Sequence, residues 1–358
     1  MSSEFEIGIQ LHLPTFRHTT LPQFIDFGRA AHAGGVSQLW VTDNLRSRNQ
    51  FVVLTALATS APLKLGTAVT VQYFRNPVDV ADSVAAITEL MDGREFGVGL
   101  ARGNRNTPSY LKVTKPISML RETAQSLRRL LAGEAVRFAD YPTVASYFNL
   151  MPEAPFQLNF RPKSPVLLYC GGNGPKALAV GGACMDGILF GGTFQSVVRA
   201  GHMGELLQVA EQAAVAAGRG FVLRKVAEIK LSVAADGRAA REFTKHSVAG
   251  RILSLREGGF NDDDYRRLGI APADVDRLQQ AEQAGGEARD YPQLVTDAMV
   301  DALFVAGDPA SCRERMTEVC AMARTHGYQQ LMFSELGPDL KQGLRLLCDE
   351  ILPGIPRL

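Results

Sequence analysis

The sequence lacks the features that mark several large classes of protein. It has no run of about eighteen consecutive apolar residues, the length that a membrane-spanning helix needs. Its start, MSSEFEIGIQ, has no basic segment followed by an apolar core, which argues against a secretory signal. Lys and Arg number 38 against 37 Asp and Glu, and this balance gives no field that attracts nucleic acid or an anionic membrane. We expect a cytoplasmic protein with neither nucleic acid nor membrane as a partner.

Cysteine and histidine are also sparse, and their spacing excludes two further classes. The five cysteines are an odd number without a C-x-x-C pair, which argues against a disulfide framework and against a zinc cluster. The histidines other than His12 show no metal-ligand spacing, so we assign no metal site. Cys312 and Cys320 fall in a helical pattern and are interpreted as small apolar packing residues. A reducing compartment suits this cysteine usage.

Short apolar runs alternate with helical patterns along most of the 358 residues. Parallel strands that are buried on both faces have this appearance. About eight strand-helix units favour a single-domain (β/α)8 barrel, a TIM barrel spanning 1–358, over a doubly wound sheet. The predicted strands are 5–11, 38–41, 63–71, 95–100, 166–170, 188–190, 222–234, 302–306 and 330–334. The predicted helices are 21–33, 51–60, 77–91, 118–132, 176–181, 205–217, 239–255, 309–325 and 339–351.

Two segments interrupt this alternation and are predicted to be insertions. Residues 133–164 place aromatic residues among prolines, which suggests short strands or a loop that packs over a site. Residues 256–296 are rich in Gly, Asp and Arg, and we interpret them as a mobile or helical insertion. Insertions at strand ends are natural lids.

A glycine-rich turn follows the predicted strand 166–170. It consists of Gly171, Gly172, Asn173 and Gly174, with Pro175 at the first helical position and Lys176 after it. Glycines before a helix let backbone N–H groups approach an anion, and Lys176 adds a full positive charge. The turn therefore predicts a phosphate-bearing ligand.

The same turn matches the G-x-G-x-x-A form of a Rossmann fingerprint. A dinucleotide site also needs an acid near the end of the next strand. Here the next strand ends in Gly191, Gly192 and Thr193, and the nearest acid, Asp186, precedes it. This disfavours an NAD enzyme, while a glycine-rich turn that binds nothing remains an open alternative.

In a barrel the site lies at the carboxyl ends of the strands. This rule gathers polar and small residues from several strands at one rim: Gln10, His12, Asp43, Asn44, Ala68, Val69, Arg102, Gly171 and Gly191. Two interpretations stay open for His12, which are proton transfer and a structural role. Two also stay open for Asp43, which are a role as an acid and an ion pair with Arg46 or Arg48.

Four stretches together resemble the bacterial-luciferase-like superfamily of barrel oxidoreductases, which use FMN or the deazaflavin F420. They are LWVTDN at 39–44, LGTAVTVQYFRNPVDVADSVAAITELMDGREFGVGLARG at 65–103, GGNGPKALAVGGACMDGILFGG at 171–192, and VAGDPASCRERM with LMFSELGPD near the C-terminus. The residues at 174–178 are similar to those of the F420-dependent methylenetetrahydromethanopterin reductase branch of this superfamily.

The resemblance implies roles for particular residues. Ala68 and Val69 should form a bulge with a non-prolyl cis peptide that backs the flavin ring, and the turn 171–176 should hold the cofactor phosphate. The implied catalytic candidates are Asp43, Asn44, Gln10 and His12. The implied cofactor contacts are Ala68, Val69, Leu100, Arg102, Gly171, Gly172, Asn173, Gly174, Lys176, Gly191, Gly192 and Thr193.

Three departures from the family pattern narrow the chemistry. Relatives that oxidise a sugar phosphate carry His at the position of Asn44 and Glu at that of Arg102, and Asn cannot act as a general base. Pterin reductases carry Glu near the position of Gln10. These departures disfavour both reactions, while Arg102 suits a carboxylate or phosphate on the substrate or the cofactor.

We therefore expect an oxidoreductase that transfers hydride between F420 and a small organic substrate. One alternative is an FMN-dependent monooxygenase that takes reduced flavin from a partner reductase. A second alternative is a flavin-binding protein without turnover. The resemblance also implies a homodimer, with the helix around 78–91 as a candidate face.

Overall fold

The computed structural model describes residues 4–103, 111–220, 222–286 and 290–356. The sequence also predicts a polar loop at 101–107, after the strand 95–100, and its residues 104–107 lie outside these ranges. In the ranges described, no helix has the length and apolar character required to cross a bilayer.

Parallel strands connected by helices form a closed (β/α)8 barrel, which confirms the predicted fold class. The chain divides into two compact units. Unit 1 comprises Met1–Ile7, Phe190–Glu205 and Val226–Leu358, and unit 2 comprises Gly8–Leu189 and Leu206–Lys225. A single domain over the whole chain stays a prediction.

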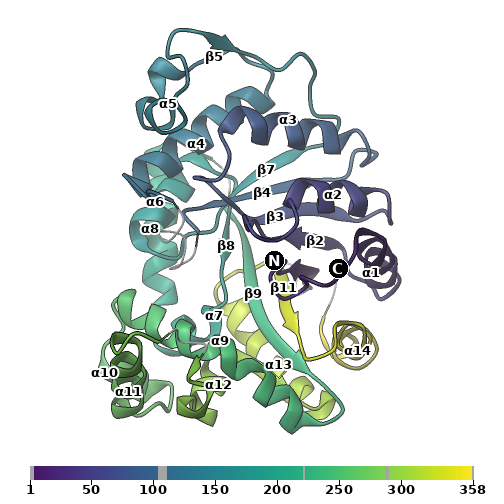
Figure 1. Ribbon diagram of the computed structural model, residues 1–358, viewed down its shortest axis with the longest axis vertical. Helices are drawn as coiled ribbons and strands as arrows, with labels where there is room; N and C mark the ends of the chain where they lie inside the picture. The colour runs from purple at the N-terminus through teal and green to yellow at the C-terminus, as the bar shows by residue number, and fades with distance from the viewer. Residues whose placement is uncertain (1–3, 104–110, 221, 287–289, 357–358) are drawn as a thin grey trace. The chain divides into compact units, whose positions relative to one another are not determined.

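Unit 2 contains the parallel strands of the first part of the chain, side by side in the order in which they occur (Figure 1). They are β1 (Glu6–Leu11), β2 (Gln38–Val41), β3 (Lys64–Val71), β4 (Phe96–Ala101), β7 (Val166–Cys170) and β8 (Gly187–Phe190), with end residues of β1 and β8 belonging to unit 1. The helices between them include α1 (Leu21–Ala33), α2 (Gln50–Ala58), α3 (Pro77–Thr88), α4 (Pro116–Leu131) and α6 (Pro175–Cys184). Helix α8 (Met203–Ala216) follows β8, and its residues from Leu206 onward belong to unit 2.

Local sequence explains where these helices begin. The Asn49 side chain accepts a hydrogen bond from the Phe51 N–H at the start of α2, and Asn76 caps α3 in the same way. Pro77, Pro116 and Pro175 occupy the first positions of their helices, where a missing N–H costs nothing.

Two large rings fill the middle of unit 2. Trp40 of β2 and Tyr169 of β7 are both buried, and their rings meet edge to face with centroids 5.4 Å apart. Glycines make room for them, because a Cβ on Gly66 or Gly97 would lie 2.5 Å from a Trp40 ring atom, and one on Gly187 would lie 2.7 Å from the Tyr169 ring. Both rings therefore belong to the core of unit 2.

Unit 1 contains most of β9 (Arg224–Val233), together with β10 (Phe304–Gly307) and β11 (Gln330–Leu336), and β9 pairs in parallel with both of the others. Its helices are α7 (Phe194–Arg199), α9 (Gly237–Glu257), α12 (Asp297–Leu303), α13 (Pro309–Thr325) and α14 (Leu340–Leu346), and the chain continues as a π-turn (Leu347–Ile351) and a 3-10 turn (Leu352–Gly354). Cys312 and Cys320 are buried on α13, as predicted.

The structure corrects two secondary-structure predictions in unit 1. The predicted strand 302–306 begins in α12, because Met299, Val300 and Leu303 form a helical apolar face and Thr296 caps the first turn. The short helix α7 was not predicted, since its six residues are too few for a clear period.

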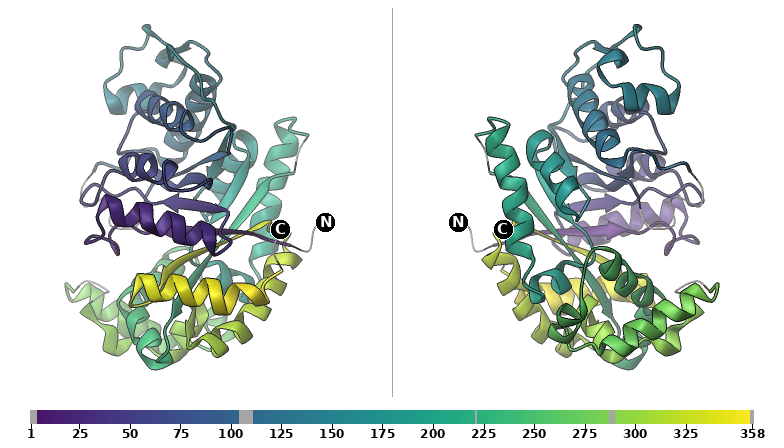
Figure 2. Two further views of the ribbon diagram at one scale, coloured as in Figure 1. Left: turned by 90° about the vertical axis from the view of Figure 1, so that its right-hand side faces the viewer. Right: turned by 90° about the vertical axis from the view of Figure 1, so that its left-hand side faces the viewer.

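Both interrupting segments contain regular structure. Residues 133–164 hold the short strands β5 (Val136–Arg137) and β6 (Pro155–Phe156), as expected, and also a 3-10 turn (Phe138–Asp140) and a helix, α5 (Pro142–Phe148), that was not predicted. Residues 256–296 are helical, with α10 (Asp262–Arg267), α11 (Pro272–Gln283) and a 3-10 turn (Pro292–Leu294). Figure 2 shows these helices, in green, lying close to one another within unit 1.

Candidate functional site

The centre of the candidate site in unit 2 is the carboxyl end of β3. The peptide bond between Ala68 and Val69 is cis, and the pairing of β3 with β4 shifts register between Thr67 and Thr70. The expected bulge and cis bond are therefore present. A Cβ on Gly171 would lie 2.3 Å from the Val69 Cγ1 atom. Glycine at 171 is what lets the Val69 side chain lie across the end of β7.

Side chains and backbone from two neighbouring strands hold this bulge in place. The Gln10 amide Nε2 donates a hydrogen bond to the Ala68 carbonyl at 3.0 Å, and the Asp43 backbone N–H donates to the Val69 carbonyl at 3.1 Å. Gln10 is only 6 % exposed. An ionised Glu at this position would be an acceptor only, so the amide suits the carbonyl. Gln10 therefore positions the bulge, which is a different task from the catalytic role for which it was a candidate.

The Asp43 carboxyl is the one candidate with a strongly perturbed environment. Its side chain is 1 % exposed, and its Oδ1 lies 3.6 Å from the Arg75 Nη2. Neither carboxyl oxygen forms a short, well-aligned hydrogen bond in the described ranges, and the Val71 and Asn44 N–H groups and the Arg75 side chain interact with it only weakly. Burial raises the pKa of Asp43 from 3.8 to about 6, against the opposing charge of Arg75. A carboxyl with a pKa close to neutrality is suited to exchanging a proton.

Arg75 is a functional candidate that the sequence interpretation missed. It is the ion-pair partner of Asp43, where Arg46 or Arg48 was predicted. Its guanidinium also lies 5.4 Å from the centre of the Phe51 ring and 3.9 Å from the Asp79 carboxylate. Its position in the turn after β3 was the available signal, but pairing with a residue 32 positions earlier depends on strand order.

The remaining candidates at the first strands have other contacts. The His12 Nδ1 lies 2.8 Å from the Thr15 hydroxyl, and the Asn44 amide oxygen accepts a hydrogen bond from the Arg46 N–H. Both contacts stabilise local turns. Arg102 is exposed, and Leu100 is buried with its carbonyl accepting from the Gly171 N–H at 2.9 Å. The structure thus joins Gln10, Asp43, Ala68, Val69, Leu100 and Gly171, and leaves His12 and Asn44 in their turns.

The glycine turn leads into α6 as predicted. Gly174 is the N-cap residue in an extended conformation, and no side chain caps the helix there. A Cβ on Gly172 would lie 2.7 Å from the Ala177 Cβ, whereas one on Gly174 would meet no described atom within 4 Å. Lys176 is exposed in the first turn. The start of α6 is therefore open to an approaching group, as an anion site requires.

Gly191, Gly192 and Thr193 belong to unit 1, where they adjoin a charged cluster. A Cβ on Gly192 would lie 2.4 Å from the Lys230 Cε, 3.2 Å from the Arg251 Nη1 and 3.3 Å from the Glu228 Oε1. Glycine is thus required at 192 for Lys230 to reach past the end of β8.

This cluster is a buried ion network. The Lys230 Nζ lies 2.7 Å from the Glu228 Oε1 and 3.1 Å from the Glu335 Oε1, and the Ser334 hydroxyl donates to Glu228 at 2.8 Å. None of the four residues is more than 7 % exposed. Glu335 has a left-handed backbone with φ of 77°, and the next residue, Leu336, follows at 64°. Such backbone is concentrated at functional sites.

Sequence reasoning missed the buried network. The sequence signal that could have revealed it is the alternation along β9. Every second residue there is polar, which indicates one polar face of the strand: Glu228, Lys230 and Ser232. The described part of the chain contains no group of three or more His, Cys, Asp or Glu side chains that could hold a metal ion.

Known proteins resemble this chain over nearly its whole length. Two relatives named 5,10-methylenetetrahydromethanopterin reductase are each 27 % identical to the chain. The match to the protein of Methanolobus tindarius covers 91 % of this chain and 94 % of that protein. The match to the protein of Archaeoglobus fulgidus covers 97 % of this chain and 99 % of that protein. The solved F420-dependent tetrahydromethanopterin reductase of Methanopyrus kandleri has a TM-score of 0.75 at 21 % identity, covering 98 % of this chain and 99 % of its own. A solved F420-dependent secondary alcohol dehydrogenase has a TM-score of 0.73 at 18 % identity, with coverage of 98 % and 99 %.

The family match extends over most of the chain. Residues 3–326 match the family described as luciferase-like monooxygenase, in agreement with the resemblance carried by 39–44, 65–103 and 171–192. The chain belongs to the luciferase-like monooxygenase family.

Proposed function

We propose that the protein is an oxidoreductase that transfers hydride between F420 and a small organic substrate. Relatives named as methylenetetrahydromethanopterin reductases, and solved neighbours named as F420-dependent, support F420. A solved neighbour that is a Baeyer-Villiger monooxygenase in complex with FMN, at 17 % identity, keeps FMN as the second cofactor candidate. The departure at Gln10 favours a substrate other than a pterin.

The observation that carries this proposal is the bulge at the end of β3. Ala68 and Val69 present a small, firmly held apolar surface, with the buried Asp43 carboxyl beside it. A flat ring with polar edges matches these two features, because its face can cover the apolar surface while an edge group pairs with the carboxyl. The uncapped glycine turn before α6 suits the phosphate of the same cofactor.

Each residue then has a defined task. Gln10 and the Asp43 N–H hold the bulge, Gly171 to Lys176 bind the phosphate, and the Asp43 carboxyl accepts or releases a proton. When bound, F420 supplies the hydride acceptor or donor, which no side chain can provide. The chain contributes orientation, a protected surface and one titrating group.

The decisive test is titration of the apoprotein with F420 and with FMN, each oxidised and reduced, followed by fluorescence or calorimetry. We expect F420 to bind more tightly than FMN. Gly174→Val should weaken that binding at least tenfold, because its side chain fills the open approach without a clash inside the protein. Gly204→Val in α8 is the matched control, since a Cβ on Gly204 also meets nothing within 4 Å. Preference for FMN would replace F420 by the monooxygenase alternative.

Turnover separates an enzyme from a flavin-binding protein without activity. Oxidation or reduction of F420 coupled to loss of an added alcohol or unsaturated compound supports the proposal. Tight binding without turnover of any tested substrate class supports the alternative of a flavin-binding protein without turnover. A homodimer and a cytoplasmic location are further parts of the proposal. Light scattering and cell fractionation test them.

A further inference from the structure

Unit 1 contains a cavity of about 540 Å³ that shares no lining residue with the candidate site described above. Its walls come from the starts of α9 and α13, the end of β10, and the facing sides of α7 and α12. Four arginines line it: Arg199, Arg238, Arg241 and Arg315. We propose that this cavity is a binding site for a small polyvalent oxyanion, a phosphate or a polycarboxylate.

The charge of the lining favours an anion. Against the four arginines the lining contains two carboxylates, Asp301 and Asp308, so its net charge is four minus two, or +2. The Asp308 carboxylate is already engaged, because it accepts a hydrogen bond from the Ser311 N–H and caps α13. Guanidinium groups bind phosphate and carboxylate oxygens in pairs, which makes them the preferred residues for this task.

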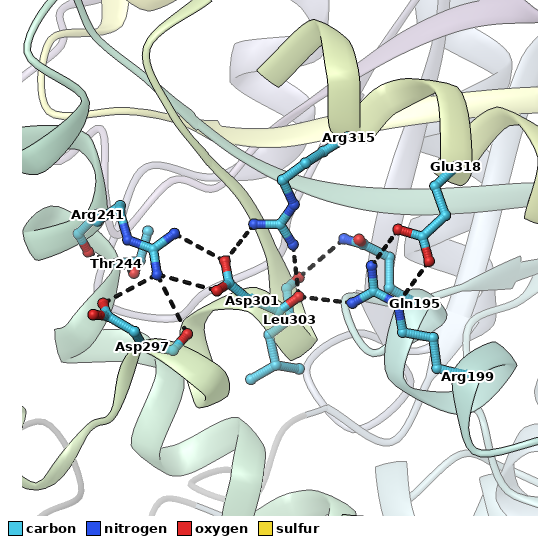
Figure 3. A network of polar contacts seen from close by, with 9 residues as sticks. All are labelled: Gln195, Arg199, Arg241, Thr244, Asp297, Asp301, Leu303, Arg315 and Glu318. Carbon is cyan, nitrogen blue, oxygen red and sulfur yellow. Dashed lines mark hydrogen bonds and ion pairs between the residues drawn. The ribbon is translucent and has the colours of Figure 1, made fainter. Parts of the chain in front are cut away.

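Figure 3 shows that three of the guanidiniums are held in place around Asp301. Arg241 Nη1 donates to the Asp301 Oδ1 at 2.8 Å, while Arg315 Nη2 and Arg199 Nη1 donate to the Asp301 backbone carbonyl at 2.7 and 2.9 Å. Fixed guanidiniums lose little freedom when a ligand binds. The network therefore prepares the site before the anion arrives.

The acidic partners outside the lining fix these arginines further without occupying the cavity. Glu318 accepts from Arg199 at 3.1 and 2.7 Å, and Asp297 accepts from Arg241 at 3.0 Å. Each guanidinium has five N–H donors, so Arg199, with three bonds in this network, retains donors for a ligand.

Arg315 is the most crowded of the four. Burial lowers its pKa, and the nearby charges of Arg199 and Arg241 act in the same direction, against the attraction of Asp301. Asp301 is thus shared between Arg315 and Arg241, while Asp297 and Glu318 pair with Arg241 and Arg199. A bound anion would reduce the repulsion that Arg199 and Arg241 exert on Arg315.

Arg238 differs from the others because it is exposed and forms no ion pair with the residues that the structure describes. It lies in the first turn of α9, which approaches α13 closely: a Cβ on Gly237 would lie 2.7 Å from the Asp308 nitrogen. Asp236 and Asp308 cap the two helices, so the guanidiniums, and not the helix ends, supply the attraction. Arg238 is free to close over a ligand.

Calorimetry with inorganic phosphate, pyrophosphate and citrate, at ionic strength held constant with NaCl, tests this proposal on the full chain. We expect saturable binding of at least one of them. Binding of the phosphates alone identifies a phosphate ligand, and binding of citrate as well identifies a general polyanion site; both outcomes support the oxyanion class. Arg238→Ala should weaken binding about fivefold, the loss of one exposed charge-assisted contact. It should not affect folding, because Arg238 is exposed and forms no ion pair within the described ranges.

Two further variants locate the binding. Arg345→Ala removes an exposed arginine of α14 in the same unit and should leave the affinity unchanged. Gly174→Val blocks the proposed cofactor turn and should also leave it unchanged, so failure of the cofactor proposal is distinguished from failure of this one. Absence of saturable binding would refute the cavity site. So would equal affinity in Arg238→Ala and Arg345→Ala, or loss of binding in Gly174→Val alone.

Discussion

Replacing Asp43 by Asn should change the pH dependence of stability in a direction opposite to that of most aspartates. The folded protein binds the Asp43 proton more tightly than the unfolded chain does, because burial raises the pKa from 3.8 to about 6. The stabilising contribution is therefore complete below pH 3.8 and is lost as the pH rises through 6. Above that pH the folded state carries an ionised, buried carboxylate.

The expected size follows from the shift. Each pKa unit corresponds to about 1.4 kcal/mol, so the rise from 3.8 to about 6 makes the ionised form cost about 3 kcal/mol. The asparagine side chain of the variant has the same shape as aspartate and does not titrate. The difference in unfolding free energy between the variant and the natural protein should thus move by about 2 kcal/mol in favour of the variant between pH 4 and pH 7.

Urea unfolding at pH 4, 5, 6, 7 and 8 measures this difference. The loss of the Asp43 charge near Arg75 also affects the variant, but at pH 4 the natural Asp43 is largely protonated in the folded state and the comparison there calibrates that effect. Asp82→Asn, which removes an exposed carboxylate of α3, is the matched control and should show no such movement.

Two results would refute the reasoning. A difference that stays constant from pH 4 to pH 7 would mean that Asp43 does not titrate in this range in the folded protein. A difference that moves in favour of the natural protein as the pH rises would mean that Arg75 outweighs burial and lowers the pKa. In either case Asp43 would be unsuited to exchanging a proton near neutrality.

Three other predictions concern packing and burial. Gly171→Ala should destabilise the protein by about 1–3 kcal/mol, because the added methyl group collides with Val69. In a background with Val69→Ala most of that cost should disappear. Urea unfolding of the two single variants and the double variant measures this, and additive effects would contradict the contact. Lys230→Met should cost about 3–5 kcal/mol because two buried carboxylates lose their nearest cation and keep only the more distant Arg251. Lys341→Met, at an exposed site on α14, should have little effect, and equal unfolding midpoints for the two variants would argue against the network. Alkylation at pH 8, followed over time by mass spectrometry, should modify the half-exposed thiols before the buried ones. Burial raises the pKa of Cys170 to about 11 and that of Cys312 to about 12, so these thiols stay protonated. Early modification of a buried thiol would contradict that burial. The half-exposed thiols are Cys184 and Cys348, and the buried ones are Cys170, Cys312 and Cys320.

Regular local patterns made much of the fold predictable. Strands β2 and β7 and helices α1 and α13 were predicted with their observed bounds, because the strands are short apolar runs that end at turn residues and the helices have a clear 3.6-residue period with a proline near the start and a glycine after the end. Helix α12 was misread as a strand start, since its last apolar residues run directly into β10. The cis bond at Ala68 came from the family resemblance and not from any periodicity.

The candidate site was predictable in part. The turn 171–176 and the residues Gln10, Asp43, Ala68 and Val69 were named from the sequence, and the structure brings the last four together. Their individual tasks were not predictable. Gln10 donates to a carbonyl of the bulge, and Asp43 pairs with Arg75, because these contacts depend on which strand ends are neighbours.

The sequence by itself determined the alternation of strands and helices, the absence of cysteine pairs and metal-ligand spacing, and the family with its cofactor class. These properties reside in residue types and in spacings of a few positions along the chain. Only the tertiary structure decided that Asp43 is buried with a raised pKa, that Lys230 lies between two glutamates, and that four arginines line one cavity. Desolvation and ion pairing depend on three-dimensional neighbours, and the neighbours of these side chains come from strands and helices that are distant in the sequence.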